Sequence, residues 1–301
     1  MNVKSAIKSM RLRTLPLSLS GVCLGILLAC ADYPVRLLPA MLVIITTVCL
    51  QIISNLSNEL GDVLHGTDNE ERIDPTYGLN GGGMTVREMK RLIIAIVVMC
   101  CLSGLAMIYS AFGTLFSATS LLLILLGAAA IVAAMRYTLG KDPYGYRGLG
   151  DLFVFIFFGL VSVLGGYFVV AGSIRDVLLL LPASSIGFFS IGVLNVNNIR
   201  DMKTDAETRV TVALKLGRRN AQIYQTALIA LGWAAMILFC ILRSPCPWRW
   251  LFILTLPLFI RHLKGIWTLD DEHLDPMLPL LVMSSFAFSL LSGFGYANFL
   301  I

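Results

Sequence analysis

Two short stretches carry side chains whose type and spacing could do chemistry, residues 55–68 (NLSNELGDVLHGTD) and residues 197–205 (NNIRDMKTD). Each follows a long apolar run and repeats asparagine or aspartate every three or four residues, which is the spacing of one helix face. An ionised aspartate inside a membrane helix costs on the order of 2.5–3.5 kcal/mol, so it needs a partner. Two acidic faces cannot neutralise each other, but together they can hold a divalent cation, and oxygen-only ligands favour Mg²⁺. The first face carries Gln51, Asn55, Asn58 and Asp62, and the second carries Asn197, Asp201 and Asp205.

The elements that must position these two faces are membrane-spanning helices. Of the 301 residues, 57% are hydrophobic and only 14% are charged, whereas ordinary soluble domains carry about 25% charged residues. A helix that crosses a bilayer needs about 20 apolar residues. We therefore expect an all-α polytopic membrane protein, with residues 1–301 forming a single domain around a central cavity that opens to the cytoplasmic side. The sequence predicts nine spans, at residues 15–31, 37–58, 92–111, 114–135, 151–171, 177–197, 221–242, 248–267 and 277–299.

The lysine and arginine residues indicate how these spans cross the membrane, because cytoplasmic loops carry an excess of both. With the N-terminus inside, 19 of the 23 basic residues fall on the inner side, and only Arg36, Arg175, Arg243 and Arg249 fall outside. We therefore expect a cytoplasmic N-terminus, an external C-terminus and two acidic stretches that face the cytoplasm. This topology accounts for the net charge of +5 and leaves no reason to expect a nucleic-acid partner. The sequence indicates no oligomeric state.

Two inner segments near the acidic stretches allow two interpretations each. Arg11 and Arg13 precede the first span, and they either anchor this segment on the inner side or reach an acidic substrate. The glycines between residues 78 and 83 either let backbone N–H groups approach phosphate or form a flexible connector.

Two other inner loops differ in what they predict. The loop 136–150 (RYTLGKDPYGYRGLG) carries three tyrosines beside Lys141 and Arg147. The membrane topology explains the positive charge of this loop but not its tyrosines, so we expect the loop to contribute to a site. The segment 268–276 is acidic but lacks a helical face of carboxylates, and we predict that it is a solvated connector.

The two acidic stretches lie about 140 residues apart, each at the inner end of an even-numbered span. This repetition predicts two related helix groups that face each other across a cavity. A bound metal with nearby arginine and lysine side chains would stabilise a departing diphosphate. Ionising an allylic C–O bond needs this clamp and a dry pocket, and a cavity inside the membrane also admits a long isoprenoid chain from lipid. The residues expected to hold Mg²⁺ are Asn58, Asp62, Asp201 and Asp205.

The pattern NExxD at residues 58–62 and NxxxDxxxD at residues 197–205, on nine spans, resembles the UbiA-type intramembrane prenyltransferases. Four stretches are similar to the menaquinone-pathway branch of that family. The resemblance implies two substrates, polyprenyl diphosphate and 1,4-dihydroxy-2-naphthoate, and a location among the lipids of the bacterial cytoplasmic membrane. It also implies the reaction, in which the polyprenyl group replaces the ring carboxylate and CO₂ and diphosphate are released to give demethylmenaquinol. The four stretches are RLRTLPLSLSG (11–21), NLSNELGDVLHGTD (55–68), YGYRGLGDLFVFIFFG (144–159) and NNIRDMKTD (197–205).

The same resemblance implies roles for individual residues. Tyr137 and Lys141 match a YxxxK pattern that the family places near the diphosphate, and the four predicted metal ligands match its magnesium and diphosphate residues. We predict that Asp62, Asp201 and Lys141 act in catalysis. The residues expected to bind substrate are Arg13, Asn55, Asp68, Arg72, Tyr137, Arg147, Arg200 and Lys203.

Two alternatives remain at this point. One is a relative that prenylates another aromatic acceptor, of the 4-hydroxybenzoate or haem type. The other, from a different class, is an ion-coupled transporter whose membrane acids bind Na⁺ or H⁺. Transporter sites tend to lie near the bilayer midplane on broken helices, whereas these acids lie at the inner ends of spans beside basic loops. This placement favours the enzyme.

Overall fold

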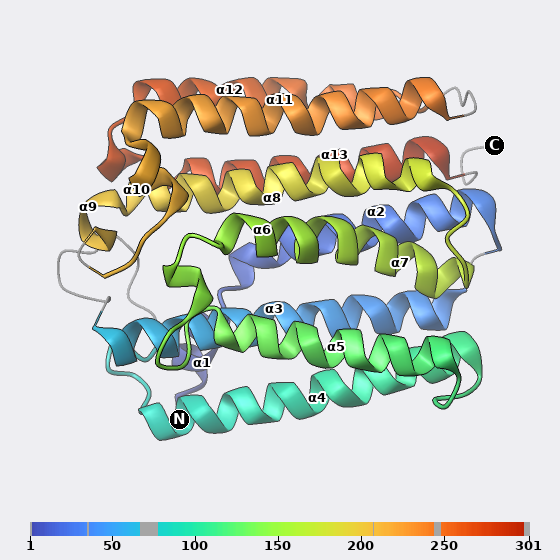
Figure 1. Ribbon diagram of the computed structural model, residues 1–301, viewed down its shortest axis with the longest axis horizontal. Helices are drawn as coiled ribbons and strands as arrows, with labels where there is room; N and C mark the ends of the chain where they lie inside the picture. The colour runs from blue at the N-terminus through green and yellow to red at the C-terminus, as the bar shows by residue number, and fades with distance from the viewer. Residues whose placement is uncertain (1, 35, 67–77, 207, 244–247, 298–301) are drawn as a thin grey trace.

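The computed structural model describes residues 2–34, 36–66, 78–206, 208–243 and 248–297, and over these residues it is helical with no β-sheet. The helices lie side by side along the long axis of the molecule (Figure 1). Their bounds are α1 Val3–Ser9, α2 Leu15–Asp32, α3 Leu37–His65, α4 Val86–Phe112, α5 Ala118–Arg136, α6 Gly150–Val154, α7 Ser162–Ala171, α8 Leu180–Arg200, α9 Met202–Asp205, α10 Val212–Leu216, α11 Arg218–Leu242, α12 Leu256–Thr268 and α13 Met277–Tyr296.

Nine helical segments of the described chain are long and apolar enough to cross a membrane, and each coincides with a predicted run. The prediction of an all-α polytopic membrane protein is therefore confirmed. The second span continues past its predicted end to His65, because the polar residues of the first acidic stretch keep helical spacing on a face that the protein covers. The central cavity and the single domain stay predictions.

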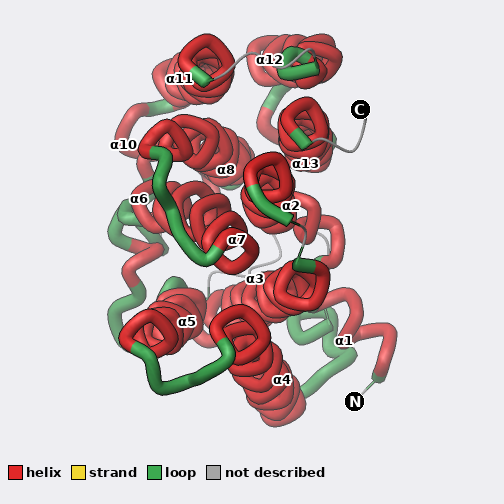
Figure 2. Tube along the Cα trace, turned by 90° about the vertical axis from the view of Figure 1, so that its right-hand side faces the viewer, coloured by secondary structure: helices red, strands yellow, loops and turns green. Residues whose placement is uncertain are grey.

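The ends of α3 and α8 that carry the acidic stretches lie at the same end of the bundle, on the left in Figure 1. The connections 137–149, 201–217 and 269–276 gather there as well, and we call this the motif end. Seen along the bundle in Figure 2, α3, α4 and α5 form one group, while α8, α11, α12 and α13 form another, with α2 and α7 between them. The two acidic stretches thus come from different helix groups, as the sequence predicts.

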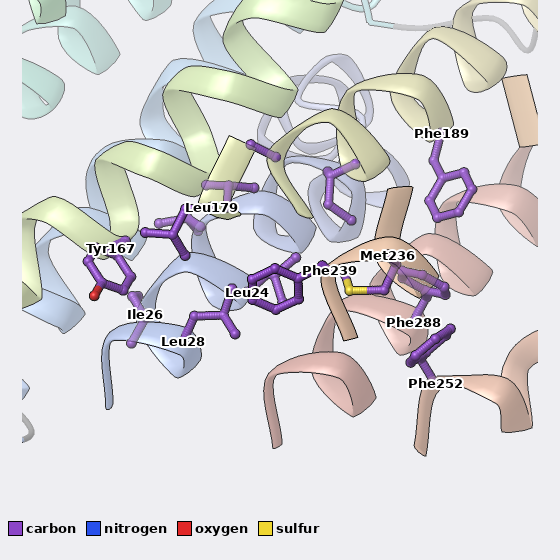
Figure 3. Packing of buried hydrophobic residues seen from close by; sticks show 14 of the residues in the cluster. Leu24, Ile26, Leu28, Tyr167, Leu179, Phe189, Met236, Phe239, Phe252 and Phe288 are labelled. Atoms are coloured by element: carbon purple, nitrogen blue, oxygen red, sulfur yellow. The ribbon is translucent and has the colours of Figure 1, made fainter. Parts of the chain in front are cut away.

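An aromatic core fixes α8 against the C-terminal helices (Figure 3). Phe189 of α8 lies edge-on to Phe288 of α13, with ring centroids 5.0 Å apart, and Phe252 contacts Phe288 at the same distance. Trp233 of α11 and Phe259 of α12 close the cluster, 5.5 Å apart. Edge-to-face pairs of this kind contribute roughly 0.5–1.5 kcal/mol each beyond area burial. The core holds the helix that ends in the second acidic stretch.

The fifth span contains a π-helical stretch, Phe155–Val161, between α6 and α7. A Cβ atom on Gly159 would lie 2.7 Å from both the Ala183 carbonyl oxygen and the Cα of Gly187 on α8. Only glycine allows this close approach of two backbones. The approach brings the first residues of α6 beside the last turns of α8, at the motif end.

The chain after the first acidic stretch packs against α1. The N–H of Gly78 donates to Ser9 Oγ over 3.2 Å, and a Cβ on Gly78 would collide with the Ser5 carbonyl oxygen. The N–H of Leu79 donates to Glu59, which is fully buried on α3, over 2.6 Å. Gly78 therefore fits neither interpretation of the glycines, because its N–H is bound to Ser9 and its backbone packs closely against α1.

Candidate functional site

Asn58 and Asp62, the predicted metal ligands of the first stretch, lie on α3 and face the loop that follows α5. Thr138 Oγ1 donates to Asn58 Oδ1 over 3.3 Å, and the Tyr146 hydroxyl donates to Asp62 Oδ1 over 2.8 Å. Asp62 is buried and Asn58 is partly buried. The loop 137–149 thus orients both oxygen-bearing side chains.

The two aspartates of the second stretch are buried, and each is paired with an arginine. Arg200, which is also buried, binds Asp201 through two hydrogen bonds, Nε to Oδ1 at 2.7 Å and Nη2 to Oδ2 at 2.9 Å. Arg209 binds Asp205 one helical turn further on, with Nε 2.9 Å from Oδ1. These ion pairs fix the orientation of both carboxylates.

Arg209 also connects the second stretch to the first. Its Nη2 lies 3.8 Å from Asp62 Oδ1, and its guanidinium carbon lies 5.2 Å from the centre of the Tyr146 ring. The next residue, Val210, donates its N–H to the Tyr146 carbonyl over 2.9 Å. The positive charge of Arg209 therefore stands between Asp62 of the first stretch and Asp205 of the second. The structure brings together two motifs that the sequence separates by about 140 residues.

The chemistry of the donor set fits a hard divalent cation. Its members offer amide and carboxylate oxygens, which are the ligands that Mg²⁺ takes in proteins. In the part of the chain that the structure describes, no three His, Cys, Asp or Glu side chains converge closely enough to hold a metal ion. The Arg209 guanidinium nevertheless marks a position between the two acidic faces where positive charge is stabilised.

Tyr137 lies beside this cluster and lines a small pocket with Asp151, Asn198 and Arg209. Burial raises the pKa of Tyr137 to about 12, a rise that Arg209 opposes and that the nearby carboxylates of Asp151, Asp62 and Asp205 increase. The phenol is therefore protonated at neutral pH and can donate a hydrogen bond.

Asn55, which we predicted to bind substrate, contacts the turn between α1 and α2. Its Nδ2 donates to the Met10 carbonyl over 2.8 Å and to Thr14 Oγ1 over 3.0 Å. Arg11 within this turn has φ = 48°, a conformation that few residues with a Cβ adopt. Asn55 thereby fixes the turn that carries Arg11 and Arg13, and its substrate contact stays a prediction.

Three other candidates lie at the surface of the motif end. Lys141, Arg147 and Lys203 are exposed, and Arg147 pairs with Asp142 of its own loop. The structure does not bring these three side chains into the buried cluster. Two further candidates, Asp68 and Arg72, lie outside the described residues.

The segment 268–276 is not the solvated connector that the sequence predicted. Asp275 Oδ1 accepts a hydrogen bond from Arg200 Nη1 over 2.6 Å, and Asp275 Oδ2 lies 3.9 Å from Arg13 Nη1. Asp271 of the same segment pairs with Arg218. The prediction was wrong because it required carboxylates at helical spacing, whereas arginines from other elements bind these carboxylates singly.

Sequence reasoning missed Arg209, Tyr146 and Asp275 as members of the site. Arg209 follows Asp205 by four residues, so the i, i+4 spacing was a signal for their pairing. Tyr146 and Asp275 reach residues 84 and 75 positions away in the sequence. No local pattern predicts such contacts.

Comparison with known proteins agrees with this arrangement. The sequence matches the UbiA prenyltransferase family over residues 18–294. It is 38% identical to the 1,4-dihydroxy-2-naphthoate octaprenyltransferase of Escherichia coli over 95% of this chain and 92% of that protein. It is 35% identical to the protein of the same name from Haemophilus influenzae, over 95% of this chain and 93% of that protein.

Solved structures agree in fold. A UbiA homologue from Aeropyrum pernix in its apo form superposes with a TM-score of 0.67 at 19% identity, covering 90% of this chain and 96% of that chain. A UbiA homologue from Archaeoglobus fulgidus, bound to GPP and Mg²⁺, superposes with a TM-score of 0.58 at 17% identity, covering 95% and 99%. With nine spans among its described residues, paired acidic stretches and a family match over most of its length, the chain belongs to the UbiA prenyltransferase family.

Proposed function

We propose that this protein transfers a polyprenyl group from polyprenyl diphosphate to 1,4-dihydroxy-2-naphthoate, with loss of CO₂ and diphosphate, to give the demethylmenaquinol of menaquinone biosynthesis. The observation that supports this most strongly is the position of the Arg209 guanidinium between Asp62 and Asp205. This position means that acidic faces from two different helix groups gather around the positive charge of Arg209. An anionic leaving group needs positive charge at such a place. The relatives from Escherichia coli and Haemophilus influenzae carry the name of this activity.

In this proposal Asn58, Asp62, Asp201 and Asp205 hold Mg²⁺. When bound, the metal would supply positive charge that stabilises the departing diphosphate. Tyr146 and Thr138 hold the first two ligands in place through their hydrogen bonds, and Arg200 orients Asp201. The donor set favours Mg²⁺ or Mn²⁺ over zinc because it contains no sulfur or imidazole.

The chain's own basic groups complete the binding of the diphosphate. Arg209 lies beside the carboxylates, and Lys141 lies on the exposed loop that begins at the end of α5. We expect Lys141 to move onto the diphosphate when the substrate binds. The protonated Tyr137 hydroxyl can donate to a phosphate or phenol oxygen from the pocket that it shares with Arg209.

The proposed reaction is balanced in atoms and charge. The allylic C–O bond breaks and its electron pair leaves with the diphosphate, and the ring carbon that carries the carboxylate forms the new C–C bond. The bond to the carboxylate then breaks, CO₂ leaves, and that electron pair restores the aromatic ring. The surrounding apolar helices exclude water, which would otherwise capture the allylic cation.

We further propose that the motif end faces the cytoplasm of a bacterium, with the N-terminus inside and the C-terminus outside. The distribution of basic residues supports this orientation. The opposite end of the bundle carries few basic groups, and two of these are held by protein partners. Arg36 donates to the Ala111 carbonyl over 2.8 Å, and Arg243 pairs with Asp32.

The function is tested with purified protein in detergent or vesicles, a polyprenyl diphosphate, 1,4-dihydroxy-2-naphthoate and Mg²⁺. We expect a prenylated quinol and one equivalent of CO₂, with turnover abolished by excess EDTA and restored by Mg²⁺ or Mn²⁺. A parallel reaction with 4-hydroxybenzoate should give little product. Faster turnover of 4-hydroxybenzoate would refute the naphthoate acceptor, and full turnover in EDTA would remove the metal from the proposal.

A further inference from the structure

We infer that Asp275 is a positioning residue that keeps Asp201 available to a divalent cation by sharing Arg200. The inference rests on the proposed function, because it concerns the metal site of that reaction. Asp275 lies in the connection between α12 and α13, about 75 residues from the stretch that it acts on.

The contacts place Asp275 on the opposite side of the Arg200 guanidinium from Asp201. Arg200 directs Nε and Nη2 to the Asp201 carboxylate at 2.7 and 2.9 Å, and Nη1 to Asp275 Oδ1 at 2.6 Å. Nη2 also donates to Asn197 Oδ1 over 3.0 Å. The Arg200 side chain is fully buried, whereas 38% of the Asp275 side chain is exposed. Arg200 is thus fixed inside the protein, and Asp275 reaches it from the surface.

Charge explains why a second carboxylate matters. A bidentate pair of one guanidinium and one carboxylate is neutral as a unit, and such a carboxylate is a weak ligand for a cation. Asp275 adds a negative charge to this unit and takes one of the guanidinium's donors, so Arg200 withdraws less charge from Asp201. The pairing also holds the Asp201 carboxylate in one orientation through an arginine that is fully buried and bound on both sides. Asp275 therefore affects the metal without being a ligand.

Asp275 also links the N-terminal segment to this unit. Its Oδ2 lies 3.9 Å from Arg13 Nη1, whose side chain is 43% exposed. Exposed ion pairs at this distance contribute little to stability. The contact with Arg13 is therefore secondary, and the effect of Asp275 should be exerted through Arg200.

The same connection offers a matched control. Asp271 lies four residues earlier and pairs with Arg218 at the start of α11. Asp271→Asn breaks one ion pair in the same segment, as Asp275→Asn does, but its arginine does not bind Asp201. A structural role of the connection would affect both variants, whereas a positioning role at the metal site affects only Asp275.

The test measures Mn²⁺ binding to the full-length purified protein by EPR, together with the metal dependence of turnover. We expect Asp275→Asn to weaken Mn²⁺ binding about tenfold, equivalent to ~1.4 kcal/mol. The Mg²⁺ concentration that gives half-maximal turnover should rise by a larger factor than kcat at saturating Mg²⁺ falls. Asp275→Ser should give the same loss, and Asp275→Glu should restore binding to within about twofold of the native protein. Asp271→Asn should leave the Mn²⁺ dissociation constant within about twofold of the native value. Thermal unfolding of all four variants shows whether each is folded.

The outcomes separate the inference from the proposed function. If Asp275→Asn and Asp275→Ser bind Mn²⁺ as Asp271→Asn does while the native protein requires metal, the inference is wrong and the proposed function stands. If the native protein neither binds Mn²⁺ nor needs a metal for turnover, the proposed function fails and the inference with it.

Discussion

Removing the charge of Arg209 should make the stability of this protein depend on a divalent cation. The Arg209 side chain is 9% exposed, and its guanidinium stands between Asp62 and Asp205, which are also buried. Arg209→Gln leaves these carboxylates with one positive charge fewer and keeps a polar side chain of similar length. If this position accepts a metal in the proposed reaction, Mg²⁺ can supply the missing charge in the variant.

The magnitude follows from the burial of the pair. Removing one partner of a buried ion pair typically costs about 3–5 kcal/mol, because the remaining charge stays buried. Solvent screening lowers this cost only slightly, because all three side chains are largely buried. A ligand at 100 times its dissociation constant stabilises the folded state by about 2.7 kcal/mol. Saturating Mg²⁺ should therefore recover more than half of the loss in the variant.

The assay is thermal unfolding of purified protein in detergent, in EDTA and in a series of Mg²⁺ concentrations. We expect the unfolding temperature of Arg209→Gln to fall in EDTA and to rise with Mg²⁺ more steeply than that of the native protein. Arg218→Gln is the control, because Arg218 pairs with Asp271 away from the acidic stretches. If Mg²⁺ raises the unfolding temperature equally in the native protein and both variants, the idea that Mg²⁺ can replace the charge of Arg209 is refuted.

Substitutions at four further residues test the individual side chains of the site. Asp62→Ala should lower turnover more than tenfold, a barrier increase above ~1.4 kcal/mol, with membrane insertion intact by fractionation; a smaller effect would remove Asp62 from the ligands. Asn58→Asp should retain more activity than Asn58→Leu because it keeps an oxygen donor, and equal inactivation would indicate a packing role. Tyr146→Phe removes a hydrogen bond to a charged group, worth ~1.5–3 kcal/mol, so kcat/KM should fall roughly ten- to hundredfold; an unchanged rate would mean that the Asp62 contact is only structural. Lys141→Ala should lower kcat and weaken binding of the prenyl diphosphate, with Lys141→Arg less affected; a selective rise in the acceptor KM would instead place Lys141 at the naphthoate carboxylate.

Local patterns predicted the helices of this protein well. Most spans are continuous apolar runs, although Arg261, His262 and Lys264 interrupt the eighth. Hydropathy measures the cost of placing such a run in lipid without reference to the rest of the chain. The predicted third span, residues 92–111, began too late, because Thr85 and Glu88 form a capping box that starts α4 at Val86. The π-helical stretch Phe155–Val161 had no such signal, because the sequence there is uniformly apolar. Its close approach to α8 is a property of the pair of helices.

The sequence by itself determined which side chains could meet a cation. Asn58 and Asp62 share a face of α3 because helical periodicity fixes the direction of residues three or four apart. The second stretch was predicted as one helix face, but the structure ends α8 at Arg200 and begins α9 at Met202, so Asp201 lies between two helices. Only the tertiary structure decided what stands between and behind these faces. Arg209 lies between Asp62 and Asp205, and Asp275 lies behind Asp201 across Arg200. The Arg209–Asp205 pair has a local signal in its i, i+4 spacing. The contacts of Arg209 with Asp62 and of Asp275 with Arg200 join loop residues to distant helices. Such contacts leave no periodic trace in sequence, because either partner can come from any element that packing brings within reach.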